Sequence, residues 1–579
     1  MTAPLVSASI AAPGFFGLNT QESSITLESG YALVADNTII DKYGRLGARK
    51  GWRYVTSGST GINLEGAHRF VGIDGVARIL SWSNTSFYLG TGTLTEITPT
   101  TDNTLTTGNW QAATLNDLCY FFQRGYKPMV FDPIAGTITD VEDEATYSGT
   151  VPQANTVLSA YGRLWVADTA NDKMVVYWSD LLDGAAWGSG SAGSIDLTAI
   201  MVQGTDEIVG LGAQNGQLLI FCRRAIVIFA DSTNNGTLDP ATLSLVEVIN
   251  RVGCVARDSI QNTGVDIFFI SEDGLKSLGR VIQEKSLPMR DLSANVRDEF
   301  VRAVATENKN DLKTVYSEDN AFYLVLLPSF QRIYAFDTRA PLQNGALRVT
   351  VWDTQTQTNM LSLPNDVYFT QVNGLVQYFG YQDNGENYRV KYYTNYFDFA
   401  APTQTKILKR ISVTVIGGSA QDFVLKSGFD YTDAYQSYPA QLTEKAVAEY
   451  NVAEYGLSNT TVAGSQGAST VTVEGSPDVH YTVDFETTQS ATYNTPYKVW
   501  SNASNYYYTT NDGSRTRVTL YTKSEDYATE YTTGTLAEAI RLPAGGSGNV
   551  LQIGFEANVN GAELSIQKID IFIKQGRVF

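Results

Sequence analysis

The residue types that most often carry out catalysis are scarce in this chain. Only two histidines, His68 and His480, are present among 579 residues. Neither belongs to a sequence motif that would supply it with a catalytic or metal-binding partner. The three cysteines, Cys119, Cys222 and Cys254, are an odd set without a Cys-x-x-Cys spacing. These counts argue against histidine-based catalysis, a zinc site and a disulfide framework.

Two glycine-containing segments have sequences similar to those of ligand-binding loops. Residues 188–193 read GSGSAG and match the GxGxxG pattern, but no helical pattern follows that could hold a pyrophosphate. Residues 231–236 read DSTNNG and lack the ligand spacing of a calcium loop. We interpret the first segment as a flexible loop and the second as a plain turn.

One acidic run is the densest candidate site that the sequence offers. Asp140, Glu142, Asp143 and Glu144 could bind a cation or face a lumen, and a solvated loop is the simpler interpretation. No Walker loop, nucleophile elbow or HExxH motif is present, so we expect no enzyme activity, no cofactor and no metal site. The sequence leaves open whether two carboxylates form a glycosidase-type catalytic pair, because it does not give distances in space.

Composition and charge favour an all-β protein that avoids nucleic acid. The chain has 43% hydrophobic and 11% aromatic residues, with 33 Tyr, 25 Phe and 50 Gly. Its formal net charge is −19, and a DNA partner would be repelled rather than held. The N-terminus has no basic n-region and no segment has the roughly 20 apolar residues that span a bilayer, so we expect a soluble protein made in a cytoplasm.

A repeat of a tight turn followed by a short apolar strand begins near residue 68. Successive turns lie roughly 40 to 60 residues apart, which is the period of a propeller blade. We predict six blades, with five or seven as alternatives and two stacked β-sandwiches as the competing architecture. The turns are Asp74-Gly75, Asn116-Asp117, Tyr161-Gly162, Asn215-Gly216, Asp273-Gly274, Asp319-Asn320 and Asn373-Gly374.

Residues 250–280 show the repeat most clearly. The apolar run 265–270 is followed by an Asp-Gly turn that requires a positive φ at Gly274, and Leu275, Leu278 and Val281 are expected to begin the returning strand. Helix is scarce, and its clearest candidate is 291–305, where Ser293 is a candidate N-cap and apolar residues recur every fourth position.

The pattern predicts three regions. Residues 1–60 are rich in Gly and Asn turns and predict an N-terminal arm, and residues 61–400 contain the β-propeller. Residues 401–579 predict a C-terminal β-sandwich-like domain, in which the alternating strands 406–415 and 566–573 pair. An insertion at 456–531, rich in Thr, Ser and Tyr, predicts an exposed β excursion.

Several segments in order along the chain resemble the tail nozzle proteins, or tail tubular proteins B, of short-tailed bacteriophages (podoviruses). The resemblance rests on residues 13–20, on Asn37 and on residues 43–52, which read YGRLGARKGW. Further matches are residues 176–184, the segment 251–256 with 266–274, and 569–571 to Gly576-Arg577.

The resemblance implies a structural virion protein of the phage tail, assembled in the host cytoplasm. Six β-propeller subunits would form the distal nozzle ring, a homohexamer that retains the genomic DNA and conducts it during ejection. Its partners would be the other copies, the tail adaptor, the tail fibres, DNA passing without sequence-specific binding, and a host surface at the tip. The alternative is a soluble glycan-binding or glycan-cleaving β-propeller at the tail tip, which would use exposed Tyr and Trp as stacking platforms.

Overall fold

The computed structural model divides the chain into two compact units. The propeller unit contains Phe15–Ile40 and Arg49–Tyr396, and the sheet unit contains Met1–Gly14, Asp41–Ala48 and Phe397–Phe579. The structure describes residues 5–57, 61–201, 206–231, 238–283, 291–354, 357–364, 366–417, 421–442 and 537–576, and the backbone of 471–474, 479–486, 506–511 and 515–522. Each unit is considered by itself.

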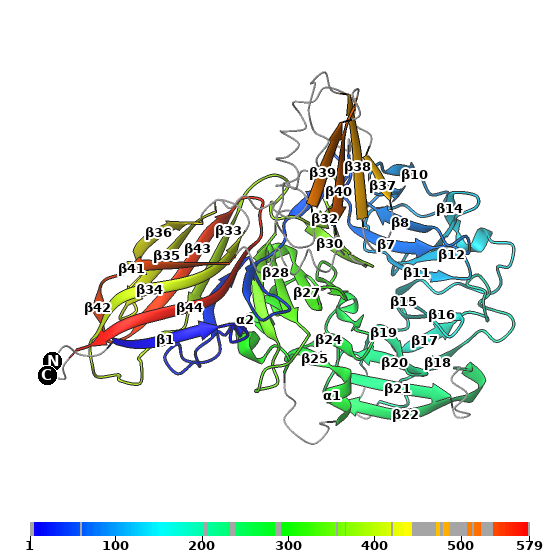
Figure 1. Ribbon diagram of the computed structural model, residues 1–579. Coiled ribbons are helices and arrows are strands. Elements are labelled where there is room, and N and C mark those ends of the chain that lie inside the picture. The colour runs from blue at the N-terminus through cyan, green and yellow to red at the C-terminus, as the bar shows by residue number, and fades with distance from the viewer. Residues whose placement is uncertain are drawn as a thin grey trace. The chain divides into compact units, whose positions relative to one another are not determined.

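The propeller unit is an all-β six-bladed propeller, as the turn and strand repeat predicts. Six four-stranded antiparallel blades follow one another around a common axis (Figure 1). The first strands of successive blades contact one another from the first blade to the fourth, between the fifth and the sixth, and between the sixth and the first. The first three blades are β7 (Gly66–Val71), β8 (Ala77–Trp82), β9 (Phe87–Leu89) and β10 (Thr95–Ile97); β11 (Gln111–Leu115), β12 (Leu118–Phe122), β13 (Met129–Asp132) and β14 (Thr137–Asp140); and β15 (Ala154–Ala160), β16 (Arg163–Thr169), β17 (Val175–Trp178) and β18 (Gly193–Asp196).

The other three blades include one strand from the beginning of the chain. They are β19 (Ile208–Gln214), β20 (Gln217–Cys222), β21 (Ala225–Asp231) and β22 (Leu243–Asn250); β26 (Lys313–Ser317), β27 (Phe322–Leu327), β28 (Arg332–Asp337) and β29 (Arg348–Asp353); and β30 (Gln357–Leu363), β31 (Asp366–Gln371), β32 (Gly374–Tyr378) and β6 (Trp52–Tyr54). Because β6 pairs antiparallel with β32, an early strand closes the last blade.

A smaller sheet lies between the fourth and fifth blades in the chain. It consists of β23 (Gln261–Asn262), β24 (Ile267–Ser271) and β25 (Gly274–Ser277), preceded by the 3-10 turn η3 (Arg257–Ser259), which contacts both β19 and β26. The predicted hairpin is present, and Gly274 has the expected positive φ of 131°.

The returning strand of this hairpin ends earlier than predicted. Leu278 and Val281 lie in the helix α1 (Leu278–Gln283) instead, where both are buried. The carboxylate of Asp266 accepts the backbone N–H of Gly279 at 2.9 Å. This bond satisfies a free N–H at the start of the helix, which explains why the strand gives way to a helical turn at this point.

The predicted helix at 291–305 is confirmed in type and begins later than expected. A 3-10 turn, η4 (Ala294–Val296), leads into α2 (Arg297–Thr306), and Leu292, Val296, Phe300 and Val304 are all buried. Ser293 does not cap it, because its hydroxyl donates to Asp291 at 2.8 Å and accepts the N–H of Leu275 at 3.1 Å.

The propeller cores lie between the faces of successive sheets. Between the first two blades, for example, Phe87 packs against Phe121 with ring centroids 4.8 Å apart, and Phe70 packs against Phe131 at 5.8 Å. Burial of such aromatic and aliphatic side chains is the main favourable contribution to folding, at about 25 cal/mol per Å² of apolar surface.

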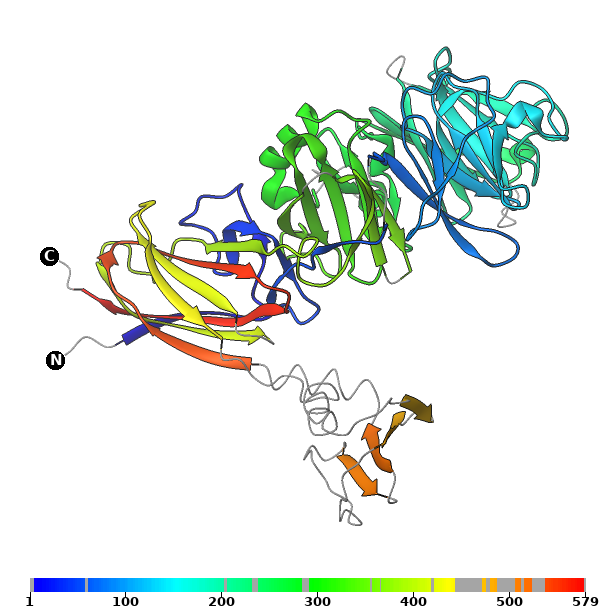
Figure 2. The same cartoon turned by 90° about the horizontal axis from the view of Figure 1, so that it is seen from above.

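The sheet unit contains two antiparallel sheets that lie one over the other (Figure 2). In the first, β44 (Leu564–Gln575) pairs with β34 (Lys406–Gly417), β1 (Leu5–Ala11) and β5 (Leu46–Ala48), while β34 also pairs with β41 (Ala537–Pro543) and β42 (Ser547–Gly548). The second contains β43 (Leu551–Val559), β35 (Asp422–Phe429) and β36 (Gln436–Gln441). The predicted pairing of the strands near 406–415 and 566–573 is therefore present.

Residues 1–60, expected as an arm of their own, are instead shared between the two units. β1 and β5 belong to the sheet unit, whereas β2 (Gly17–Leu18), β3 (Tyr31–Asp36), β4 (Thr38–Ile40) and β6 lie in the propeller unit. In the propeller unit, β3 pairs with β29 and with β33 (Tyr388–Thr394). The reason is that short strands between Gly and Asn turns have free edges, which larger sheets satisfy by pairing.

The insertion at 456–531 lies mostly outside the described residues. Its described strands are β37 (Val471–Glu474), β38 (Val479–Glu486), β39 (Tyr506–Asn511) and β40 (Arg515–Thr522), and they pair only with one another, in the order β37-β38-β40-β39.

This separate pairing leads to a prediction about a deletion. Replacing residues 456–531 with a short Gly/Ser linker should leave the propeller unit folded, because no described propeller strand pairs with the insertion. Differential scanning calorimetry of the deletion protein should retain the cooperative transition of the full chain. If that transition disappears, the insertion is part of the folded core.

Candidate functional site

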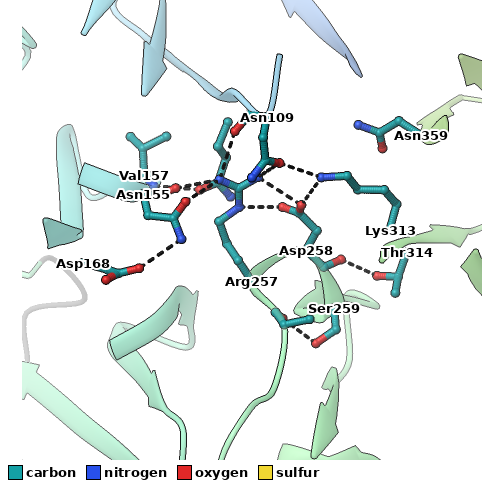
Figure 3. A network of polar contacts seen from close by, with 12 residues as sticks. Asn109, Asn155, Val157, Asp168, Arg257, Asp258, Ser259, Lys313, Thr314 and Asn359 are labelled. Atoms are coloured by element: carbon teal, nitrogen blue, oxygen red, sulfur yellow. Dashed lines mark hydrogen bonds and ion pairs between the residues drawn. The ribbon is translucent and has the colours of Figure 1, made fainter. Parts of the chain in front are cut away.

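A cluster of partly buried charges lies among the first strands of the propeller (Figure 3). Arg257, in η3, donates through Nη1 to the backbone oxygen of Asn155 at 2.7 Å and through Nη2 to Oδ1 of Asn109 at 3.1 Å. Asn155 lies in β15, and Asn109 lies two residues before the start of β11. One guanidinium therefore connects the small sheet with the second and third blades.

Asp258 and Lys313 complete the cluster. The Asp258 carboxylate accepts from Arg257 Nε at 2.8 Å and lies 2.5 Å from Nζ of Lys313, the first residue of β26. Lys313 also donates to Oδ1 of Asn109 at 3.0 Å, and the hydroxyl of Thr314 donates to the backbone oxygen of Asp258 at 2.6 Å. We call Asn109, Asn155, Arg257, Asp258 and Lys313 the axial clasp.

Opposing effects set the charge states in the axial clasp. Burial would raise the pKa of the Asp258 carboxyl, but the attraction of Arg257 and Lys313 and their hydrogen bonds outweigh burial and hold that pKa below its usual value. Burial lowers the pKa of Lys313, and Asp258 opposes this decrease. We conclude that the carboxylate is ionised and holds two cations near the propeller axis.

A second ion cluster lies beside the axial clasp. Asp168, which is 4% exposed, pairs with Arg124 and lies 2.9 Å from Nζ of Lys173, and its Oδ2 accepts from Asn155 at 3.0 Å. Asn155 therefore belongs to both clusters. Together they tie the second and third blades, the small sheet and the fifth blade to one another, so the arrangement chemically acts as a cross-link between sheets.

The acidic run predicted from the sequence does not form one site. Asp140 is the last residue of β14, the outermost strand of its blade; its buried carboxylate accepts the hydroxyl of Thr101 and the N–H of Asp102. Asp140 therefore holds a loop, and its carboxylate is buried instead of exposed on the surface.

The other three acidic residues differ in exposure. Glu142 pairs with Lys127 at 2.9 Å, whereas burial and the nearby carboxylates of Asp132 and Asp183 raise the pKa of Glu144. Asp143 is exposed and has no hydrogen bond or ion pair in the described part of the chain. It is therefore the exposed member of the run whose charge no described residue pairs.

The GSGSAG segment is held in a defined turn rather than a phosphate loop. The carboxylate of Asp180 accepts both the N–H and the hydroxyl of Ser191, at 3.0 and 2.8 Å. A Cβ on Gly190 would lie 1.9 Å from the same carboxylate, so its glycine is required by packing. Residues 232–236 of the other candidate turn lie outside the described residues.

The candidate histidine and cysteines take structural positions. His68, in β7, lies 3.1 Å from the hydroxyl of Thr114 in β11, and burial lowers its pKa to about 4. Cys119, Cys222 and Cys254 are buried free thiols. Among the described residues, no group of three or more His, Cys, Asp or Glu side chains is arranged to hold a metal ion, and no described helix is long and apolar enough to cross a membrane.

The fold and its axial cross-link define a structural class, the all-β propeller. No family model matches the chain, and no curated protein matches it. Among solved structures it is similar to the CNH domain of AfRom2, with 10% identity, TM-score 0.32, and coverage of 56% of this chain and 97% of that one.

Two further solved structures are similar to this chain at about the same level. Hydrazine synthase of Kuenenia stuttgartiensis has 12% identity and TM-score 0.32, covering 56% of this chain and 98% of that one. Hsv2 of Kluyveromyces lactis has 10% identity and TM-score 0.25, covering 51% and 98%. Likeness at this level carries no argument about activity or partners.

Proposed function

We propose that the chain is a structural subunit of the tail of a short-tailed bacteriophage. Six copies would form the distal nozzle ring, beneath the tail adaptor and beside the tail fibres, and the ring would retain the genomic DNA and then conduct it during ejection. The proposal rests on the resemblance to tail tubular proteins B, and one structural observation supports it.

That observation concerns the positions that the residues of the resembling segments occupy in the fold. Several of their residues occupy positions where the fold admits few alternatives: a Cβ on Gly44 would lie 2.5 Å from Cβ of Pro13, and one on Gly51 would lie 1.9 Å from the backbone oxygen of Gln382. Arg49 is fully buried and makes a two-pronged ion pair with Asp383. Two proteins that share a fold would be expected to share residues at positions where packing permits few alternatives.

The net charge of −19 suits a conduit as well. A wall of like charge repels the duplex and keeps it from adhering, and salt screens this repulsion over about 8 Å at physiological ionic strength.

Assembly provides the direct test of this proposal. The purified chain should sediment largely as a monomer at micromolar concentration, because subunits of like charge repel and the adaptor nucleates the ring. Mixed with the adaptor protein encoded in the same genome, it should give particles with a six-fold ring by electron microscopy. A stable hexamer of the pure chain would contradict the assembly step, and failure to associate with the adaptor would contradict the tail function.

A test of the conduit itself uses the exposed acidic residue. Exchanging Asp143 for Lys should slow genome release from otherwise intact particles, with the defect decreasing as salt rises, because a lysine would attract the phosphate backbone. Release is measured as DNA ejected over time by a fluorescent dye. Exchanging the exposed Asp319, in the turn between β26 and β27, for Lys serves as the control. Release equal to wild type in the Asp143 variant at low salt would exclude Asp143 from the lumen.

A further inference from the structure

A hollow of about 460 Å³ lies on the propeller unit, beside helix α2. One wall is α2, with Asp298 and Arg302; the opposite wall is the start of β28 with the preceding 3-10 turn η5 (Pro328–Phe330). Thr20 and Gln21, which follow β2, complete the rim. Its volume lies within the range of small-ligand sites, about 300–1,000 Å³.

The walls of the hollow are fixed by contacts beneath the surface. The Tyr334 ring packs edge-on against Phe300 with centroids 5.3 Å apart, and its hydroxyl donates to Glu299 at 3.1 Å. The backbone N–H of Thr20 donates to the backbone oxygen of Asn295 at 2.8 Å, next to the start of α2. The hollow is therefore formed before any ligand arrives.

The rim carries hydrogen-bonding groups that the described protein does not use. The side chains of Thr20, Gln21, Asp298 and Arg302 make no hydrogen bond or ion pair with described residues. A hydroxyl, a carboxamide, a carboxylate and a guanidinium together offer both donors and acceptors toward one small volume.

An exposed aromatic ring lies at the same hollow. Phe330, at the turn between β27 and β28, is 40% exposed, although an aromatic side chain of this size is normally buried. A flat apolar ring beside unused donors and acceptors matches a ligand with one apolar C–H face and a rim of hydroxyl groups.

Charge narrows the ligand class. The hollow is lined by two carboxylates, Asp298 and Glu299, and two guanidinium groups, Arg302 and Arg332, so the site has no net charge. This balance disfavours phosphate and nucleic acid, which need an excess of cations. We propose that the hollow is a saccharide-binding site for a neutral hexose unit, with Phe330 as the stacking platform and Asp298 and Arg302 as hydroxyl-binding groups.

The test uses the full-length chain and the methyl glycosides of glucose, galactose, mannose and N-acetylglucosamine. Saturation-transfer NMR and calorimetric titration should show saturable binding of at least one of them. Phe330→Ala should weaken that binding about tenfold, and Asp298→Asn severalfold, since each removes part of the contact without touching the core. Phe379→Ala, at a 46% exposed ring in the last blade, is the matched control and should bind as wild type does.

Several results would overturn the proposal. They are no saturable binding of any of the four glycosides, binding that both Phe330→Ala and Asp298→Asn leave unchanged, and stronger binding of methyl glucuronide than of every neutral glycoside. Thermal melts of each variant verify folding before titration. The binding measurement needs no ring, so its outcome is independent of the assembly test of the tail function.

Discussion

Asp258→Asn should lower the free energy of unfolding by about 3–5 kcal/mol, because removing one member of a buried ion cluster leaves Arg257 and Lys313 without their counter-charge. Urea titration followed by tryptophan fluorescence measures the loss. Asp74→Asn, which removes an exposed carboxylate from its pair with Arg78, is the matched control and should leave the midpoint unchanged.

Restoring the charge balance should recover part of this loss. In the double variant Asp258→Asn/Lys313→Met, one uncompensated cation is gone, so its stability should exceed that of Asp258→Asn alone. If Asp258→Asn melts within about 0.5 kcal/mol of wild type, the axial clasp makes no net contribution to stability.

The pH dependence separates the axial clasp from His68. The folded pKa of Asp258 is depressed, so its contribution is fully present above the unfolded value of about 3.9 and is lost as pH falls through the folded value. His68 has a folded pKa of about 4, lowered from 6.5, so it destabilises the folded state as pH falls from 6.5 toward 4. The gap between wild type and Asp258→Asn should therefore stay constant above pH 5 and narrow only below about pH 4.

The second large effect is expected where the early strand closes the last blade. Arg49→Met should cost about 3–5 kcal/mol, because Asp383 would remain as an unpaired, largely buried carboxylate. The guanidinium also lies over the rings of Trp52 and Tyr388, 4.8 and 4.2 Å from their centroids. Guanidinium chloride unfolding measures the difference.

A paired substitution tests the cause of this loss. Arg49→Met/Asp383→Leu removes both charges and should be clearly more stable than Arg49→Met, since an apolar pair of similar size can replace a buried ion pair. Arg49→Lys should also be destabilised, because one ammonium group cannot make both bonds. Equal stability of Arg49→Met and the double variant would show that the loss comes from packing over the rings instead.

Local turn chemistry made the blades predictable from the sequence. Asn116-Asp117, Tyr161-Gly162 and Asn215-Gly216 all have positive φ at both positions, and each joins the first and second strands of a blade. Such turns can be read from two or three adjacent residues. The same reasoning placed the strand that begins at Lys406 beside the one near the chain end, since alternation of apolar residues shows which face is buried.

The axial clasp could not be predicted in this way. Arg257 lies 102 residues from Asn155 and 148 from Asn109, and Lys313 lies 204 residues from Asn109. Only the curvature of a closed ring brings them together. A signal was present in the adjacent charges Arg257 and Asp258 directly after the apolar segment 252–256, but a charged pair there is equally typical of a solvated turn.

The interleaving of the first sixty residues has a consequence for the order of events during synthesis. β6 cannot pair until β32, more than 300 residues later, has been synthesised. β1 likewise cannot pair until β44, near the other end of the sequence, has been synthesised. At about 5–20 residues per second, a ribosome would leave the edge of β1 without its native partner for roughly half a minute to two minutes. Unpaired strand edges on neighbouring nascent chains of one mRNA can pair with each other instead. Slower translation initiation, or a chaperone that covers short strands, should therefore increase the yield of soluble protein.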